Sequence, residues 1–168
     1  LNVGGEPHLE SVHTLNSAQQ EAYNQILLNF LKHDVVLLHG VTSSGKTEVY
    51  IHLIEQALQE HKQVLYLLPE IALTVQITTR LQRVFGRRMA IYHSKYSDAE
   101  RVEIWQKQMS AHPYDVILGA RSAVFLPFQN LGLVIIDEEH ETSFKQQDPA
   151  PRYHARSAAI VLAGMYPD

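Results

Sequence analysis

The sequence contains no cysteine, which excludes disulfide bonds and any metal site built from thiolates. No apolar run approaches the roughly 18 residues that a membrane span requires. Residues 1–5 lack the basic and apolar regions of a signal peptide. A large excess of charge of one sign is also missing, because the net charge is only -4. A polyanionic partner would therefore have to be bound by local basic groups.

The chain of 168 residues is 45% hydrophobic and 19% charged, which is typical of a globular protein with one domain. It has no internal repeats and no low-complexity tracts. Residues 1–14, with Gly4, Gly5 and Pro7, are predicted to be a linker or leading arm. The remaining residues, 15–168, are predicted to form one folded unit.

Short apolar runs alternate with segments of helical periodicity along the folded unit. Strands are predicted at residues 35–39, 63–68, 89–93, 115–118 and 131–136, and helices from residue 16 and at residues 47–60, 70–85, 97–110 and 153–163. The helix at 97–110 carries the apolar residues Val102, Ile104, Trp105 and Met109. Alternating strands and helices predict an α/β fold with a mostly parallel central sheet and helices on both faces.

Residues 40–47 read Gly-Val-Thr-Ser-Ser-Gly-Lys-Thr and match the phosphate-binding P-loop pattern G-x-x-x-x-G-K-[ST]. A predicted strand precedes them and a predicted helix follows, which is the context that the motif requires. In such a loop, backbone N–H groups and the helix N-terminus bind phosphates. The loop residues predicted to hold the nucleotide are Gly40, Thr42, Ser43, Ser44, Gly45, Lys46 and Thr47. Lys46 would reach the β- and γ-phosphates and the Thr47 hydroxyl would bind Mg²⁺, the alternative being a glycine turn that caps a helix.

The apolar residues 133–136 lead into Asp137, Glu138, Glu139 and His140. Ligands of open α/β sheets bind at the carboxyl ends of the strands, where this run of acids lies. Asp137 fits the acid that holds Mg²⁺ in P-loop enzymes, and Glu138 suits a residue that polarises the attacking water. The alternative is an acidic, solvated turn. Together with the P-loop, this segment predicts a nucleoside-triphosphatase site with Lys46, Asp137 and Glu138 as its catalytic residues.

Asp-Glu-Glu-His at residues 137–140 resembles motif II of the superfamily 2 helicases. Residues 15–22, Leu-Asn-x-x-Gln-x-x-Ala, look like the family's segment that contacts adenine, with Gln19 as the reading residue. Gln19 also fits the third helical position of a capping box that begins at Asn16, which is the alternative. The resemblance implies a RecA-like P-loop NTPase fold that binds ATP and Mg²⁺.

Residues 68–74 resemble motif Ia of these helicases, and residues 119–125 resemble the motif that follows it. In the family, both loops hold one strand of nucleic acid by its phosphates, which implies this role for Thr74, Arg121 and Ser122. A helix N-terminus and a guanidinium group are suited to phosphate binding. A simple helix start and a turn remain the alternative.

Three stretches, residues 92–105, 119–128 and 137–156, resemble the primosomal replication-restart helicases within superfamily 2. The last stretch looks like an aromatic, basic loop that senses single-stranded DNA and couples it to the ATP site in that family. The resemblance implies coupling or DNA contacts for His140, Phe144, Lys145, Arg152 and Tyr153. The aromatic side chains suit base stacking, and ordinary packing is their alternative.

The resemblance extends from about residue 15 to the end and corresponds to the first RecA-like lobe of a helicase. We expect the second lobe, the N-terminal DNA-binding region and the zinc module of this family to lie outside the sequence, and zinc to bind only in that module. The implied partners are single-stranded and forked DNA, the second lobe, other primosome proteins and single-strand binding protein, with no membrane. The implied location is the bacterial cytoplasm, at the nucleoid.

The sequence therefore predicts the ATP-binding motor lobe of a DNA helicase that restarts stalled replication forks. We expect the isolated chain to be catalytically incomplete, because the arginine finger of such enzymes belongs to the second lobe. Three alternatives stay open. They are another superfamily 2 translocase, a P-loop enzyme such as a kinase acting on a small molecule, and a nucleotide-gated or inert DNA-binding module.

Overall fold

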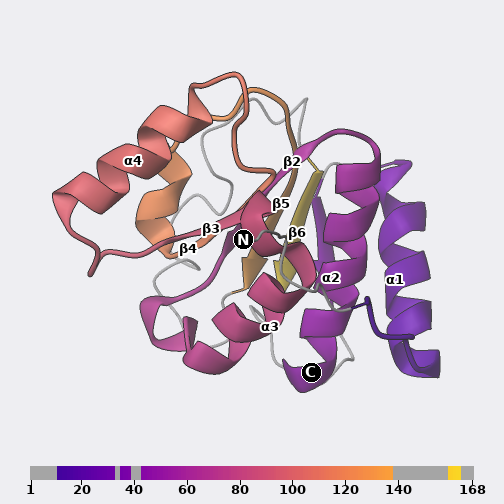
Figure 1. Ribbon diagram of the computed structural model, residues 1–168. Helices are drawn as coiled ribbons and strands as arrows, with labels where there is room; N and C mark the ends of the chain where they lie inside the picture. The colour runs from indigo at the N-terminus through magenta and orange to yellow at the C-terminus, as the bar shows by residue number, and fades with distance from the viewer. Residues whose placement is uncertain (1–10, 33–34, 39–42, 138–158, 164–168) are drawn as a thin grey trace.

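The computed structural model describes residues 11–32, 35–38, 43–137 and 159–163. Six parallel strands form one sheet in the order β1-β6-β5-β2-β4-β3 (Figure 1). The strands are β1 (Val35–Leu38), β2 (Gln63–Leu67), β3 (Met89–Tyr92), β4 (Val116–Gly119), β5 (Leu131–Asp137) and β6 (Ala159–Ala163). The α-helices are α1 (Ser17–Phe30), α2 (Ser43–Gln59), α3 (Val75–Phe85) and α4 (Asp98–Gln108). Short 3₁₀ turns are η1 (Glu70–Ala72), η2 (Gly86–Arg88) and η3 (Arg121–Phe125).

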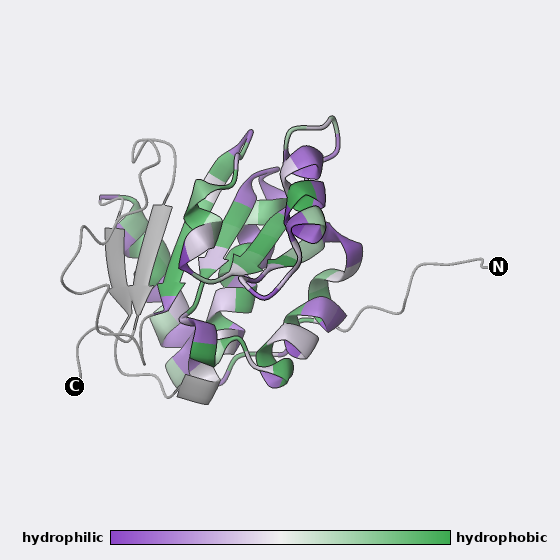
Figure 2. Cartoon of the chain, turned by 90° about the vertical axis from the view of Figure 1, so that its left-hand side faces the viewer, coloured by the Kyte–Doolittle hydropathy of each residue, from purple (hydrophilic) through white to green (hydrophobic). Residues whose placement is uncertain are grey.

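Two apolar cores lie on opposite faces of the sheet. Because side chains alternate along a strand, Val64, Tyr66 and Leu68 face one core while Leu65 and Leu67 face the other. Helices α1, α2 and α3 cover the first core, and α4 with η3 covers the second. Figure 2 shows the apolar strands between helices of mixed hydropathy. The predicted parallel α/β sheet with helices on both faces is therefore confirmed.

Local signals fix where the helices begin. Asn16 and Gln19 form a reciprocal capping box at the start of α1, and Ser97 and Glu100 form another at the start of α4. Each box satisfies backbone N–H groups that the first helical turn leaves without partners. The sequence pattern predicted both starts to within two residues.

The predicted helix at residues 70–85 is wrong, because the segment divides at Thr74. Residues Glu70–Ala72 form a 3₁₀ turn, and Thr74 has extended backbone angles. Its hydroxyl accepts a hydrogen bond from the Ile77 N–H at 3.3 Å and begins a new helix, α3. A β-hydroxyl side chain competes for local backbone groups, which favours a cap over a helix interior.

The predicted helix at residues 153–163 is also wrong where the structure describes it. Residues Ala159–Ala163 form strand β6, which pairs in parallel with β1 and with β5. A short apolar run with two alanines fits a buried helix and a buried strand equally well from its composition. The position between two strands, which is a long-range property of the fold, decides for the strand.

Helix α4 buries only part of its apolar side chains. Ile104 is buried, whereas Val102, Trp105 and Met109 are 49%, 36% and 63% exposed. Only a small part of the helix surface therefore packs against the rest of the protein. None of the described helices has the length and apolar character that a bilayer crossing requires.

Candidate functional site

The P-loop segment enters helix α2 earlier than the sequence predicted. The helix begins at Ser43, so residues 43–47 of the motif lie in its first turns. Gly40 and Thr42 lie outside the described residues, and the side chains of Ser43 and Ser44 are not described. The N-terminus of a helix carries unpaired N–H groups and positive dipole, which together favour a bound phosphate.

Lys46 is a charged residue in the first turn of α2. It is only 8% exposed, whereas Thr47 next to it is half-buried. A lysine is rarely buried without a function or a partner, because desolvation of the ammonium group costs free energy. Lys46 is the residue that the P-loop pattern assigns to binding the phosphates.

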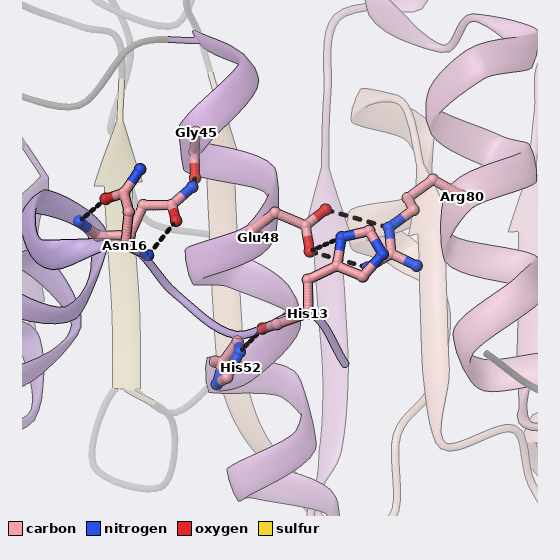
Figure 3. A network of polar contacts seen from close by, with 7 residues as sticks. His13, Asn16, Gly45, Glu48, His52 and Arg80 are labelled. Atoms are coloured by element: carbon pink, nitrogen blue, oxygen red, sulfur yellow. Dashed lines mark hydrogen bonds and ion pairs between the residues drawn. The ribbon is translucent and has the colours of Figure 1, made fainter. Parts of the chain in front are cut away.

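Gln19 connects helix α1 to the P-loop segment. Its side-chain carbonyl accepts a hydrogen bond from the Asn16 N–H at 2.9 Å, and its side-chain NH₂ donates to the Gly45 carbonyl at 3.1 Å (Figure 3). The capping role that we considered as an alternative is therefore present together with a contact to the loop. An amide has two donors and two acceptor lone pairs, so these bonds leave one donor and one lone pair for a ligand.

Asp137 is the last residue of β5, at the carboxyl edge of the sheet. The amino-terminal end of α2 lies at the same edge, because α2 follows β1 in a parallel sheet. Tyr66 in β2 links the two. Burial raises the pKa of its phenol well above the usual value, the Asp137 carboxylate raises it further, and the Thr47 side chain lowers it. Thr47, near the start of α2, and Asp137, at the end of β5, therefore lie at the same edge of the sheet.

The oxygen atoms of the Thr47 and Asp137 side chains are of the kind that Mg²⁺ prefers as ligands. A hydroxyl and a carboxylate are hard oxygen ligands, and Mg²⁺ in nucleotide sites uses one or two such groups together with waters and phosphates. In the described part of the chain, no group of three His, Asp or Glu side chains has the arrangement of an all-protein metal site. A metal held by Thr47 and Asp137 would need further ligands, which waters and phosphates supply in nucleotide sites.

A second group of predicted residues lies at the ends of β2, β3 and β4. Here η1 and η3 border a hollow lined by Pro69, Glu70, Ile71, Ser94, Ala120, Arg121, Ser122 and Phe125. Ile71 and Phe125 are 73% and 75% exposed at this hollow, and Arg121 is exposed beside them. The Ser122 hydroxyl is buried without a hydrogen-bond partner among the described residues. Arg121 and Ser122 therefore both line this hollow, and Thr74 is the exposed cap of α3, after η1.

His93 lies beside this hollow and contacts Glu70, one of its lining residues. The Lys95 N–H donates to His93 Nδ1 at 3.0 Å, so the ring proton of neutral His93 is on Nε2. That nitrogen lies 3.4 Å from a carboxylate oxygen of Glu70 and completes a contact between the end of β3 and η1. Neither residue was predicted to have a role.

Glu48 and Arg80 form a network that the sequence analysis missed (Figure 3). Arg80 Nε donates to Glu48 at 3.0 Å and Arg80 Nη2 donates to the other carboxylate oxygen at 2.8 Å. The His13 ring lies 3.3 Å from Glu48, and the ring of His52 contacts the His13 carbonyl oxygen at 2.7 Å. Because Glu48 follows Thr47, this network joins the nucleotide end of α2 to α3. Glu48 follows the motif directly, but nothing local to Arg80 signals the pairing.

The last group of predicted residues lies outside the described part of the chain. It comprises Glu138, His140, Phe144, Lys145, Arg152 and Tyr153.

Comparison with known proteins places the chain in a family. A model of the DEAD/DEAH box helicase family matches residues 16–162, and the chain belongs to this family. Membership implies ATP and Mg²⁺ as ligands. The predicted helicase lobe and its RecA-like fold are confirmed.

Within the family, the chain is similar to replication restart protein PriA from several bacteria, which confirms the resemblance found in the sequence. It is 46% identical to PriA of Bacillus subtilis over 151 residues, 89% of this chain and 18% of that protein. It is 46% identical to PriA of Synechocystis over 145 residues, 86% of this chain and 17% of that protein. The chain therefore spans about a fifth of the length of these relatives.

Solved structures share the fold at lower identity. RecG bound to a three-way DNA junction matches with a TM-score of 0.65 and 22% identity, covering 90% of this chain and 21% of RecG. The SWI2/SNF2 ATPase core of Sulfolobus solfataricus in complex with double-stranded DNA matches with a TM-score of 0.62 and 16% identity, covering 96% of this chain and 34% of that one.

Proposed function

We propose that this chain is the ATP-binding first motor lobe of a DNA helicase that restarts stalled replication forks. The observation that carries the proposal is that the start of α2, with Thr47 and the buried Lys46, lies at the same carboxyl edge of a parallel sheet as Asp137. The similarity to PriA proteins supports the replication role. Such a protein would work on chromosomal DNA in the bacterial cytoplasm.

The residues have distinct roles in this proposal. Lys46 neutralises charge on the β- and γ-phosphates, and the donor and lone pair that Gln19 keeps free suit the adenine edge. Thr47 and Asp137 hold Mg²⁺, which when bound offsets the negative charge of the phosphates. Glu138, the next residue after Asp137, orients and polarises the attacking water. Gly40, Thr42, Ser43, Ser44 and Gly45 supply the backbone cradle.

The hollow between η1 and η3 is the proposed DNA surface. Arg121 supplies a guanidinium for phosphate, Ser122 supplies a buried hydroxyl, and Thr74 marks the N-terminus of α3, where phosphate is favoured. His140, Phe144, Lys145, Arg152 and Tyr153 would couple bound DNA to the nucleotide. The proposed partners are single-stranded and forked DNA, the second helicase lobe, primosome proteins and single-strand binding protein.

Hydrolysis by this chain alone should be slow. An arginine finger from a second lobe contributes about 10³–10⁵ in rate in P-loop enzymes of related mechanism. We expect the Lys46, Thr47 and Asp137 site to bind nucleotide without that contribution. We therefore propose that the chain alone binds ATP weakly, hydrolyses little and unwinds no DNA.

Fluorescence anisotropy of labelled single-stranded DNA tests the proposal. The chain is titrated without nucleotide, with ADP and Mg²⁺, and with a non-hydrolysable ATP analogue and Mg²⁺. A motor lobe gives an affinity for DNA that depends on the nucleotide and falls in Arg121→Ala. The charge-matched control is Arg83→Ala, which removes an exposed arginine from the last turn of α3, outside the proposed DNA surface.

Three other outcomes would contradict the proposal. DNA affinity that ignores the nucleotide would favour an inert DNA-binding module. Nucleotide binding without any DNA binding would favour a P-loop enzyme that acts on a small molecule. Robust DNA-stimulated turnover by the chain alone would refute the dependence on a second lobe.

A further inference from the structure

Tyr66 is a buried tyrosine at the centre of the sheet whose role the proposed function does not explain. It lies in β2, opposite Ile135 of β5. Because side chains alternate along a strand, Tyr66, Ile135 and Asp137 project from the same face of the sheet. Helix α2 covers that face, since Tyr66 and Ile135 share a core with α2 residues such as Tyr50.

A second tyrosine holds the ring of Tyr66 in place. The rings of Tyr50 and Tyr66 meet edge to face with centroids 5.4 Å apart, and both side chains are 0% exposed. Tyr50 follows Thr47 by one helical turn, so the two residues lie on the same side of α2. The Tyr66 ring accordingly lies on the face of the sheet that carries Asp137 and against the side of α2 that carries Thr47.

The hydroxyl is buried and yet poorly satisfied. Among the described residues, no partner forms a hydrogen bond with it. A buried hydroxyl without a good partner costs free energy, and phenylalanine would fill the same space without that cost.

We infer that Tyr66 is a positioning residue for the Mg²⁺–nucleotide site, and that its hydroxyl bridges the Thr47 hydroxyl and the Asp137 carboxylate when that site is filled. The inference rests on the proposed function. A threonine oxygen that faces a metal must direct its own proton elsewhere, and Tyr66 Oη is the acceptor on the protein side. The phenol proton then donates to Asp137. Such hydrogen bonds behind the ligands fix their orientation and strengthen metal binding.

The test compares Tyr66→Phe with the unchanged chain and with the matched variant Tyr50→Phe, which removes a hydroxyl from the other ring of the pair. Binding of a fluorescent ADP analogue is titrated at saturating Mg²⁺ and again in EDTA. The dissociation constant in EDTA divided by that at saturating Mg²⁺ measures how much Mg²⁺ strengthens nucleotide binding. Thermal melting without ligands reports on the folded state.

The inference predicts that Tyr66→Phe lowers this ratio about tenfold, as the loss of a group behind metal ligands does elsewhere, and leaves binding in EDTA unchanged. Its melting temperature should equal or exceed that of the unchanged chain, and Tyr50→Phe should keep the ratio. An unchanged ratio in Tyr66→Phe would overturn the inference, and a lower melting temperature with an unchanged ratio would show a purely structural role. If the unchanged chain binds no nucleotide, the proposed function fails, and the inference fails with it.

Discussion

The pair Glu48–Arg80 should stabilise the fold by more than an ordinary surface ion pair. Two hydrogen bonds of 3.0 and 2.8 Å join the side chains, which are 18% and 15% exposed. Exposed pairs contribute about 0–1 kcal/mol, and a hydrogen bond to a charged group contributes about 1.5–3 kcal/mol. Desolvation opposes part of that gain. We therefore expect a coupling free energy of about 2 kcal/mol.

A double-mutant cycle with Glu48→Gln, Arg80→Gln and the double variant measures this coupling by urea unfolding at pH 7. The cycle also separates the pair from the contact between His13 and Glu48. A destabilisation of about 2 kcal/mol corresponds to a decrease in melting temperature of about 4–8 °C in a domain of this size. A coupling below about 0.5 kcal/mol would refute the reasoning, because it is the value of an exposed pair.

The same pair predicts a dependence on pH. The hydrogen bond from Arg80 lowers the pKa of Glu48, burial opposes this shift, and the nearby charges lower the pKa further. A carboxyl whose pKa is lower in the folded state stabilises the fold above its unfolded pKa, which is about 4.3. That contribution is lost as the pH falls through the folded value. The stability difference between the unchanged chain and Glu48→Gln should therefore be constant near pH 7 and shrink in acid.

Two further predictions concern single positions. In Gly119→Ala, the new Cβ would lie 2.7 Å from the Tyr92 carbonyl oxygen and 2.8 Å from Ala123 Cβ, so urea unfolding should show a loss of about 1–3 kcal/mol. An unchanged free energy of unfolding would contradict the close approach of these strands. In Gln19→Ala, the capping box and the bond to Gly45 are both lost. Stability should fall by about 0.5–2 kcal/mol, and the preference for ATP over GTP should weaken in competition binding. If Gln19→Ala keeps the preference for ATP over GTP, Gln19 does not recognise adenine.

The sequence was sufficient for the parts of the fold that depend on local signals. Asn16 and Ser97 mark helix starts by their own side-chain chemistry, and the P-loop pattern locates Lys46 and Thr47. The sequence was insufficient where the secondary structure of a segment depends on residues far away along the chain. The strand at Ala159–Ala163 exists because β1 and β5 flank it, and no local pattern reveals those neighbours.

The candidate site shows the same division. Asp137 was predictable because an acid follows a buried apolar run. Tyr66 was not, because its relation to Thr47 and Asp137 depends on the register between β2 and β5. Arg80 was likewise missed, since its partner Glu48 is 32 positions away in the sequence.

Calorimetric titration of the chain with ADP tests the central claim most directly, because it asks whether the Lys46, Thr47 and Asp137 site binds a nucleotide. The account predicts one site that binds more tightly with Mg²⁺ than in EDTA, and the loss of this binding in Lys46→Ala while the variant still melts cooperatively. An identical isotherm for the unchanged chain and Lys46→Ala, or no binding by either, would contradict it.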